Sequence, residues 1–199
     1  MNPLKSISGT IVSGFILTAI IALGAGINGF NVMQVEVWLH AIFGITWVGL
    51  LYYFNFVQVP AVGQALGEAN NGGPGPAAIN KYVAPKALLW FRWAAVATWL
   101  TGLGALQNLG AGGALKAFTF AEGFAIIGIG AWLGTIMLIN VWAIIWPNQK
   151  KILGLDGKTH SPESIAKAKV VALMASRTNT VLSVPMLMSM TGFAHGLHF

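Results

Sequence analysis

Five long apolar runs, separated by shorter polar segments, dominate the chain. They cover residues 10–30, 37–59, 87–106, 118–146 and 179–198. A helix needs about 20 apolar residues to cross a hydrocarbon core of about 30 Å, and it satisfies its own backbone hydrogen bonds in lipid. The pattern therefore predicts an all-α fold, in which residues 1–199 form one integral membrane bundle of five transmembrane helices.

The polar connections differ in kind. Residues 67–86 are rich in glycine and proline and predict an irregular loop, whereas residues 107–116 predict a short turn. The longest polar segment contains a helix start, because Ser161 can cap a helix and Pro162 suits its first position. We expect a helix over about 162–176 to lie at the membrane interface before the fifth span.

The composition is typical of an integral membrane protein. Of 199 residues, 56% are hydrophobic and 8% charged, with a mean hydropathy of +0.71. A soluble domain has about a quarter charged residues. The net charge of +6 does not indicate nucleic-acid binding, because the basic residues lie between the apolar runs. The chain has no cysteine, which excludes thiolate metal sites and covalent c-type haem.

The basic residues also predict the orientation. With the N-terminus inside, only Lys116 lies in an outer connection, and Arg92 lies within the third span. The other basic residues fall on the inner side: Lys5, Lys81, Lys86, Lys150, Lys151, Lys158, Lys167, Lys169 and Arg177. This bias predicts an N-terminus inside and a C-terminus outside, with Trp146 at the inner interface.

This topology gathers ionisable residues at the outer face. His40 lies about 6 Å into the second span, at 1.5 Å per residue. Glu122 near the start of the fourth span and His195 near the end of the fifth share that depth, with Glu36 and His198 closer to the surface. Ionisable groups at membrane depth are costly, so each is a functional candidate.

Three interpretations of these ionisable residues at the outer face remain open. His40, Glu122, His195 and His198 could bind a non-haem metal ion such as copper, iron or zinc. His40 and a C-terminal histidine could instead hold a haem b as axial ligands. In the structural alternative, each histidine near the interface bonds a carbonyl or reaches water.

Polar residues also lie toward the inner ends of the spans. Arg92 reaches the inner interface or a lipid phosphate, or together with Arg177 it binds an anion such as a haem propionate or a substrate carboxylate. Asn55, Asn140 and Asn179 are predicted to form interhelical hydrogen bonds. The middle of the membrane is apolar, which disfavours a transporter.

Three segments resemble the membrane domain of bacterial urate hydroxylases. They are WLHAIFGITWVGLLYYFNF (38–56), IIWPNQKKILG (144–154) and SRTNTVLSVPMLMSM (176–190) with the histidine that follows. The matching residues are His40, Trp47, Gly49, Pro147, Gln149, Lys150, Arg177, Asn179, Leu182, Pro185 and His195. The first segment is also loosely similar to haem-b-containing membrane protoporphyrinogen oxidases.

The urate hydroxylase resemblance implies a redox protein of the bacterial inner (cytoplasmic or intracytoplasmic) membrane. It implies oxidation of a small heterocycle, with His40 and His195 as first-choice ligands and Glu122 moving the proton. The family's cytochrome c tail has no counterpart here, so electrons would pass to a separate cytochrome c. The alternative is a non-catalytic subunit that packs against partner subunits or further copies of itself.

Overall fold

The computed structural model describes residues 2–27, 29 and 31–196, and those residues form helices and no strand. The helices are α1 (Ile7–Gly24), α2 (Val32–Tyr52), α3 (Val59–Ala69), α4 (Ala84–Asn108), α5 (Gly113–Phe118), α6 (Ala125–Asn140), α7 (Trp146–Ile152) and α8 (Pro162–His195). A 3₁₀ turn, Pro3–Lys5, precedes α1. The predicted all-α class is therefore confirmed.

Three π-helical segments join some of these helices into longer ones. They are η2 (Tyr53–Gln58), η3 (Ile79–Val83) and η4 (Val141–Ile145). Each is followed by a helix with proline at its second residue: Pro60, Pro85 and Pro147. A proline ring collides with the carbonyl four residues earlier in an α-helix, and a wider π turn relieves that collision. The helix therefore continues through each proline.

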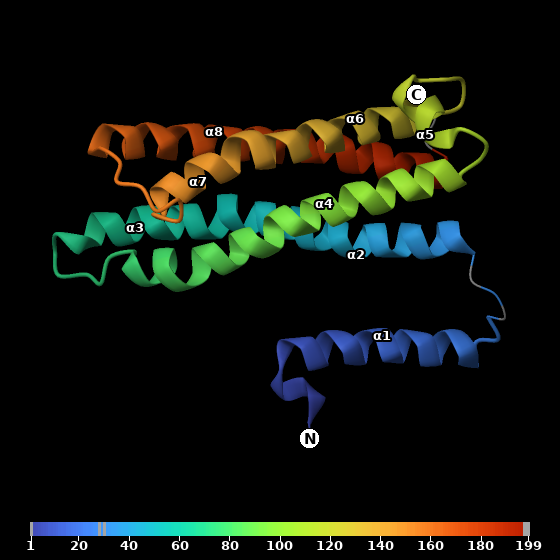
Figure 1. Ribbon diagram of the computed structural model, residues 1–199, viewed down its shortest axis with the longest axis horizontal. Helices are drawn as coiled ribbons and strands as arrows, with labels where there is room; N and C mark the ends of the chain where they lie inside the picture. The colour runs from blue at the N-terminus through green and yellow to red at the C-terminus, as the bar shows by residue number, and fades with distance from the viewer. Residues whose placement is uncertain (1, 28, 30, 197–199) are drawn as a thin grey trace.

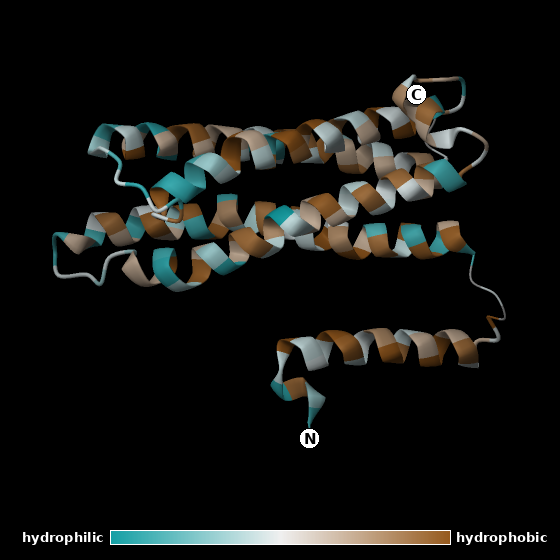
Figure 2. Ribbon diagram, viewed as in Figure 1, coloured by the Kyte–Doolittle hydropathy of each residue, from teal (hydrophilic) through white to brown (hydrophobic). Residues whose placement is uncertain are grey.

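Four helical segments are long and apolar enough to cross a membrane: Ile7–Gly24, Val32–Ala69, Ala125–Ile152 and Pro162–His195. Each matches one of the predicted runs. Many of their large side chains are exposed, for example Ile45 at 74% and Val181 at 69%, which indicates a lipid environment. Figure 2 shows that hydrophobic residues dominate the middle of the bundle and that hydrophilic residues gather toward its two ends.

The predicted third span corresponds to α4, which has 25 residues and packs along α2. Arg92 lies within it and lowers its hydropathy below that of the other four segments. The number of spans and their orientation therefore stay predictions.

The bundle has two ends, which differ in their polar residues (Figure 1). The His end holds the start of α2 with His40 and the end of α8 with His195, and the Lys end holds α7 with Lys150 and Lys151.

Several predicted boundaries differ from the structure; for example, α1 ends at Gly24, and the helix of the second run extends over Val32–Ala69. Helical structure resumes at Ala77, so the loop after α3 is much shorter than 67–86. The fourth run begins at Ala125 rather than at 118, because Phe120 and Gly123 adopt left-handed backbone conformations (φ 54° and 78°) that break the helix. The predicted interfacial helix and the fifth span form one continuous helix, α8. Its start is confirmed, since the Ser161 side chain accepts a hydrogen bond from the Ser164 backbone N–H.

The connection between α7 and α8 is tied by a short side-chain contact between His160 and Asp156. His160 Nε2 lies 2.7 Å from Asp156 Oδ2. Hydrogen bonding from His160 is the main cause that lowers the pKa of the Asp156 carboxyl. Asp156 and the lysines around it keep this end of the bundle polar.

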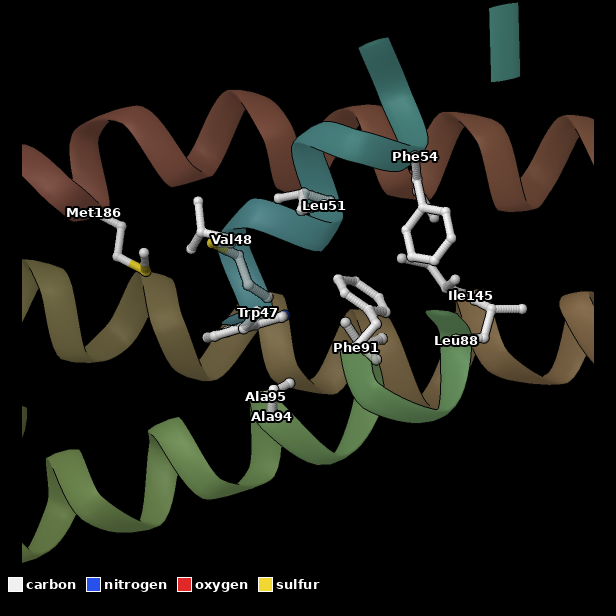
Figure 3. Packing of buried hydrophobic residues seen from close by; sticks show 13 residues of the cluster. Trp47, Val48, Leu51, Phe54, Leu88, Phe91, Ala94, Ala95, Ile145 and Met186 are labelled. Carbon is white, nitrogen blue, oxygen red and sulfur yellow. The ribbon is translucent and has the colours of Figure 1, made fainter. Parts of the chain in front are cut away.

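The main core lies where α2, α4, η4 and α8 meet. Its largest fully buried side chains include Trp47, Leu51 and Phe91, and Figure 3 shows them converging between these helices. Phe54 and Phe91 meet edge to face, with ring centroids 5.4 Å apart. α1 differs from the rest, because it has no buried residue and lies apart from the bundle (Figure 1). It contacts the bundle through α2, where the rings of Phe15 and Trp38 meet edge to face with centroids 5.5 Å apart.

Candidate functional site

His40 is held in one orientation by α4. Its Nδ1 lies 2.7 Å from the backbone carbonyl oxygen of Thr98. A carbonyl oxygen can only accept, so Nδ1 carries the proton and Nε2 keeps its lone pair. Among the described residues, Nε2 has no recorded hydrogen-bond partner. An imidazole whose Nδ1–H is fixed by a carbonyl is the usual state of a histidine that ligates metal through Nε2.

Two glycines of α4 make room for this face of α2. A Cβ on Gly102 would stand 2.7 Å from His40 Cε1 and 2.8 Å from Nδ1, closer than atoms can pack. A Cβ on Gly104 would fall on the Glu36 carboxylate. Both glycines belong to the GLGAL segment (102–106), whose small residues let α2 and α4 approach closely. They accommodate the two ionisable side chains of α2, His40 and Glu36.

Glu36 lies one turn from His40 on the same helix. Residues four apart share one face of a helix. The Glu36 Oε2 accepts a hydrogen bond of 2.8 Å from Asn108 Nδ2 at the end of α4. His40, Glu36 and Asn108, together with Gly102 and Gly104, thus form a polar seam between α2 and α4, called the α2–α4 seam below.

His195 ends α8 at the same end of the bundle but in different surroundings. It is exposed, and its Nδ1 lies 2.8 Å from the Thr191 carbonyl oxygen of its own helix. Its Nε2 is therefore the nitrogen with the lone pair, as in His40. His40 contacts α4, whereas His195 contacts its own preceding turn, so the structure records no contact that pairs them. The predicted ligand His198 lies outside the described residues.

Glu122 occupies a different position from the one predicted. The fourth run was expected to bury it at the depth of His40, but Glu122 is exposed in the connection between α5 and α6. The left-handed turn at Phe120 and Gly123 removes it from the helix. Within the described ranges, no group of three or more His, Asp or Glu side chains could hold a metal ion. The four-residue metal site therefore stays an untested prediction.

The two arginines predicted to bind an anion have different surroundings. The Arg92 guanidinium carbon stands 3.9 Å from the ring centroid of Trp146, so it stacks on the start of α7. Arg177 is exposed on α8. A shared anion site for the pair, such as a haem propionate pocket, remains a prediction.

The three asparagines form interhelical hydrogen bonds, as predicted. Asn55 Nδ2 donates to Ser176 Oγ on α8 at 2.8 Å. Asn140 Nδ2 donates to Asn179 Oδ1 at 2.7 Å and to the Ala175 carbonyl at 2.9 Å, while Asn179 Nδ2 donates to the Met137 carbonyl at 3.0 Å. Asn179 is fully buried. In an apolar bundle such bonds fix the register of α6 against α8.

Toward the C-terminal end of α8, hydroxyl groups continue the row of polar residues that begins with Asn179; this row is called the polar stripe of α8. Ser183 Oγ lies 2.9 Å from the Tyr52 hydroxyl of α2. Ser189 Oγ accepts from the Gly130 backbone N–H of α6 at 2.9 Å and donates to the Ile126 carbonyl. The hydroxyl thus stands between an N–H and a carbonyl four residues apart in α6, which would otherwise bond each other. The stripe joins α8 to both α2 and α6.

Comparison with known proteins identifies a resemblance for part of the chain. Residues 113–199 match the family model described as urate oxidase N-terminal. The C-terminal part of this chain is similar to the urate oxidase N-terminal family. No curated protein matches the chain, and no solved structure matches it.

The match to the urate oxidase N-terminal family covers α5 to α8, a little under half of the chain. It includes two of the three segments that carried the resemblance in the sequence, with Arg177, Asn179 and His195. The segment with His40 lies before it. The role of His40 therefore rests on its geometry in the α2–α4 seam.

Sequence reasoning missed the residues that position His40. Thr98 contributes only its backbone carbonyl, which no side-chain pattern can reveal. Gly102, which faces His40, and Gly104 and Asn108, which face Glu36, had a visible signal, since they lie within seven residues around the outer end of the third run. The signal did not show which residues of α2 face them.

Proposed function

We propose that this chain is a membrane-embedded redox protein, similar to urate hydroxylase membrane domains, that holds a haem b or a non-haem metal ion at the His end of the bundle. By resemblance it oxidises a small heterocycle and passes electrons to a separate cytochrome c. The supporting observation is the state of His40, whose ring is fixed by the Thr98 carbonyl and whose Nε2 has no recorded partner among the described residues.

The donor chemistry at this end suits such a group. His40 is half-buried and oriented, and it offers a neutral nitrogen, which both a haem iron and a non-haem metal ion accept as ligand. His195 offers a second nitrogen in the same tautomer. When bound, a haem or redox-active metal accepts electrons from the substrate.

The chain's own residues have separate tasks in this proposal. His40 binds the group through Nε2, and the Thr98 carbonyl keeps the ring in place. Proton transfer was assigned to Glu122, but Glu36 lies on the His40 face of α2 and is held by Asn108. Glu36 is therefore the better placed carboxylate to exchange a proton with water.

A membrane assay tests this function. Membranes that contain the full chain should reduce added soluble cytochrome c when urate is supplied, and membranes with His40→Ala should not. The matched control is His160→Ala, because that histidine lies in the α7–α8 connection at the other end of the bundle. Equal rates in wild-type, His40→Ala and chain-free membranes would contradict the proposal.

The second candidate function is that of a non-catalytic subunit of a larger membrane complex or homo-oligomer. The observation that favours it is α1, which is apolar and has no buried residue within this chain. Purification in mild detergent tests this candidate. Stoichiometric partner proteins, together with an isolated chain that lacks haem and metal, would support it.

A further inference from the structure

Two cations at the Lys end share one aromatic ring. The Trp146 indole lies at the junction of η4 and α7. The Arg92 guanidinium carbon of α4 is 3.9 Å from its centroid, and the Lys150 Nζ, one turn further along α7, is 5.7 Å from it. Each cation–π contact is favourable, but two positive charges around one ring repel each other.

Among the described residues, no carboxylate is recorded within ion-pair distance of Arg92 or Lys150. The contact of this kind that the described part of the structure records is Asp156 with His160. The chain has five acidic residues, and each is engaged or placed elsewhere: Glu36 with Asn108, Glu68 with Gln64, Asp156 with His160, Glu163 with Ser161, and Glu122 in the α5–α6 connection. An anion from outside the chain would therefore relieve the repulsion between the two cations.

The position of the cluster indicates where this anion comes from. Arg92 lies five residues into the predicted third span, which is about 8 Å along the helix. Trp90 and Trp93 on the same helix are 50% and 55% exposed, so this part of α4 faces lipid. Trp93 packs edge to face on Trp142, one turn before Trp146, which fixes α4 against η4. Tryptophan and long cationic side chains of this kind favour the membrane interface.

We propose that Arg92, Trp146 and Lys150 form a binding site for the phosphodiester headgroup of an anionic phospholipid in the leaflet at the Lys end. The guanidinium donates two parallel hydrogen bonds to phosphate oxygens, and the ammonium adds a second positive charge. The guanidinium stacks on the Trp146 indole ring, which holds it in one orientation. This site is separate from the α2–α4 seam, and it stands whether or not the proposed redox function is correct.

Native mass spectrometry of the full chain in detergent tests the site. The protein is titrated with phosphatidylglycerol and with phosphatidylcholine that has the same acyl chains, and bound lipid is counted. Wild-type protein should retain more phosphatidylglycerol than phosphatidylcholine. Arg92→Gln and Lys150→Gln should each weaken that binding by about fivefold, because one Lys or Arg near the surface of an anionic membrane contributes about that factor to the affinity. Lys81→Gln is the matched control, since Lys81 stands alone over Tyr82 at 5.3 Å.

Each outcome has a definite meaning. Arg92→Lys should retain more phosphatidylglycerol than Arg92→Gln. Lys150 is partly exposed, so Lys150→Gln should leave the helix content measured by circular dichroism unchanged. Three results would overturn the proposal: equal retention of the two lipids by wild-type protein, equal losses in Lys81→Gln and Lys150→Gln, or displacement of the lipid by millimolar inorganic phosphate. The last result would mark a free-anion site instead of a lipid site.

Discussion

Asn179→Ala should destabilise the bundle by about 2 kcal/mol, because it removes two interhelical hydrogen bonds from a fully buried position. Interhelical hydrogen bonds in membranes contribute on average about 0.6 kcal/mol each. The rest comes from the small cavity and from the weakened hydrogen bonding of the Asn140 amide. The free energy of unfolding can be measured by steric trapping in bicelles.

The matched control is Thr178→Ala, one residue away. Thr178 is exposed, and its hydroxyl bonds only the Met174 carbonyl of its own helix. We expect it to change stability by a few tenths of a kcal/mol. Asn140→Ala should cost less in the Asn179→Ala background than in wild-type protein, because the shared bond is already lost. Equal costs in the two backgrounds would show that the asparagines act independently.

Gly102→Ala should release His40 from its orientation. The added Cβ would stand 2.7 Å from the His40 ring, so the ring must rotate away or α4 must move. Rotation breaks the bond to the Thr98 carbonyl. Loss of such an outer hydrogen bond weakens metal binding by about 10- to 100-fold. We therefore expect the haem or metal content of purified protein to fall steeply while helical circular dichroism is retained.

Gly49→Ala on α2 is the control for Gly102→Ala. A Cβ there would meet no atom within 4 Å, and its backbone is helical. It should leave the bound cofactor and the helix content unchanged. If Gly102→Ala and Gly49→Ala retain the same cofactor content, the glycine does not position a ligand, and the seam between α2 and α4 only packs the helices.

The helices themselves were predictable because lipid imposes a simple length and composition on them. Ser161 and Pro162 marked the start of α8, and the asparagines were expected to join helices. The π segments were not predicted, although Pro60, Pro85 and Pro147 were the visible signal. The start of α6 was misplaced because Phe120 adopts a left-handed conformation that bulky residues rarely adopt.

The site was less predictable because it depends on how two helices align. Counting residues from the membrane surface placed His40 and Glu122 at one depth, but depth does not say which residues face one another. The partner of His40 is a backbone oxygen of Thr98, 58 residues away. Only the register of α2 against α4 brings these two groups together. Glu36 shares the face of His40 because it lies four residues earlier on the same helix, and the register of α2 against α4 brings Asn108 to it.

An absorption spectrum tests the central claim most directly. Detergent-purified wild-type protein and His40→Ala are compared in the oxidised and dithionite-reduced states, with metal analysis on the same samples. The proposal predicts a Soret band that shifts on reduction, or a stoichiometric metal without such a band, and its loss in His40→Ala. A cofactor that stays at wild-type content in His40→Ala would contradict the ligand assignment. Neither pigment nor metal, in wild-type protein purified without stripping, would contradict the redox function itself.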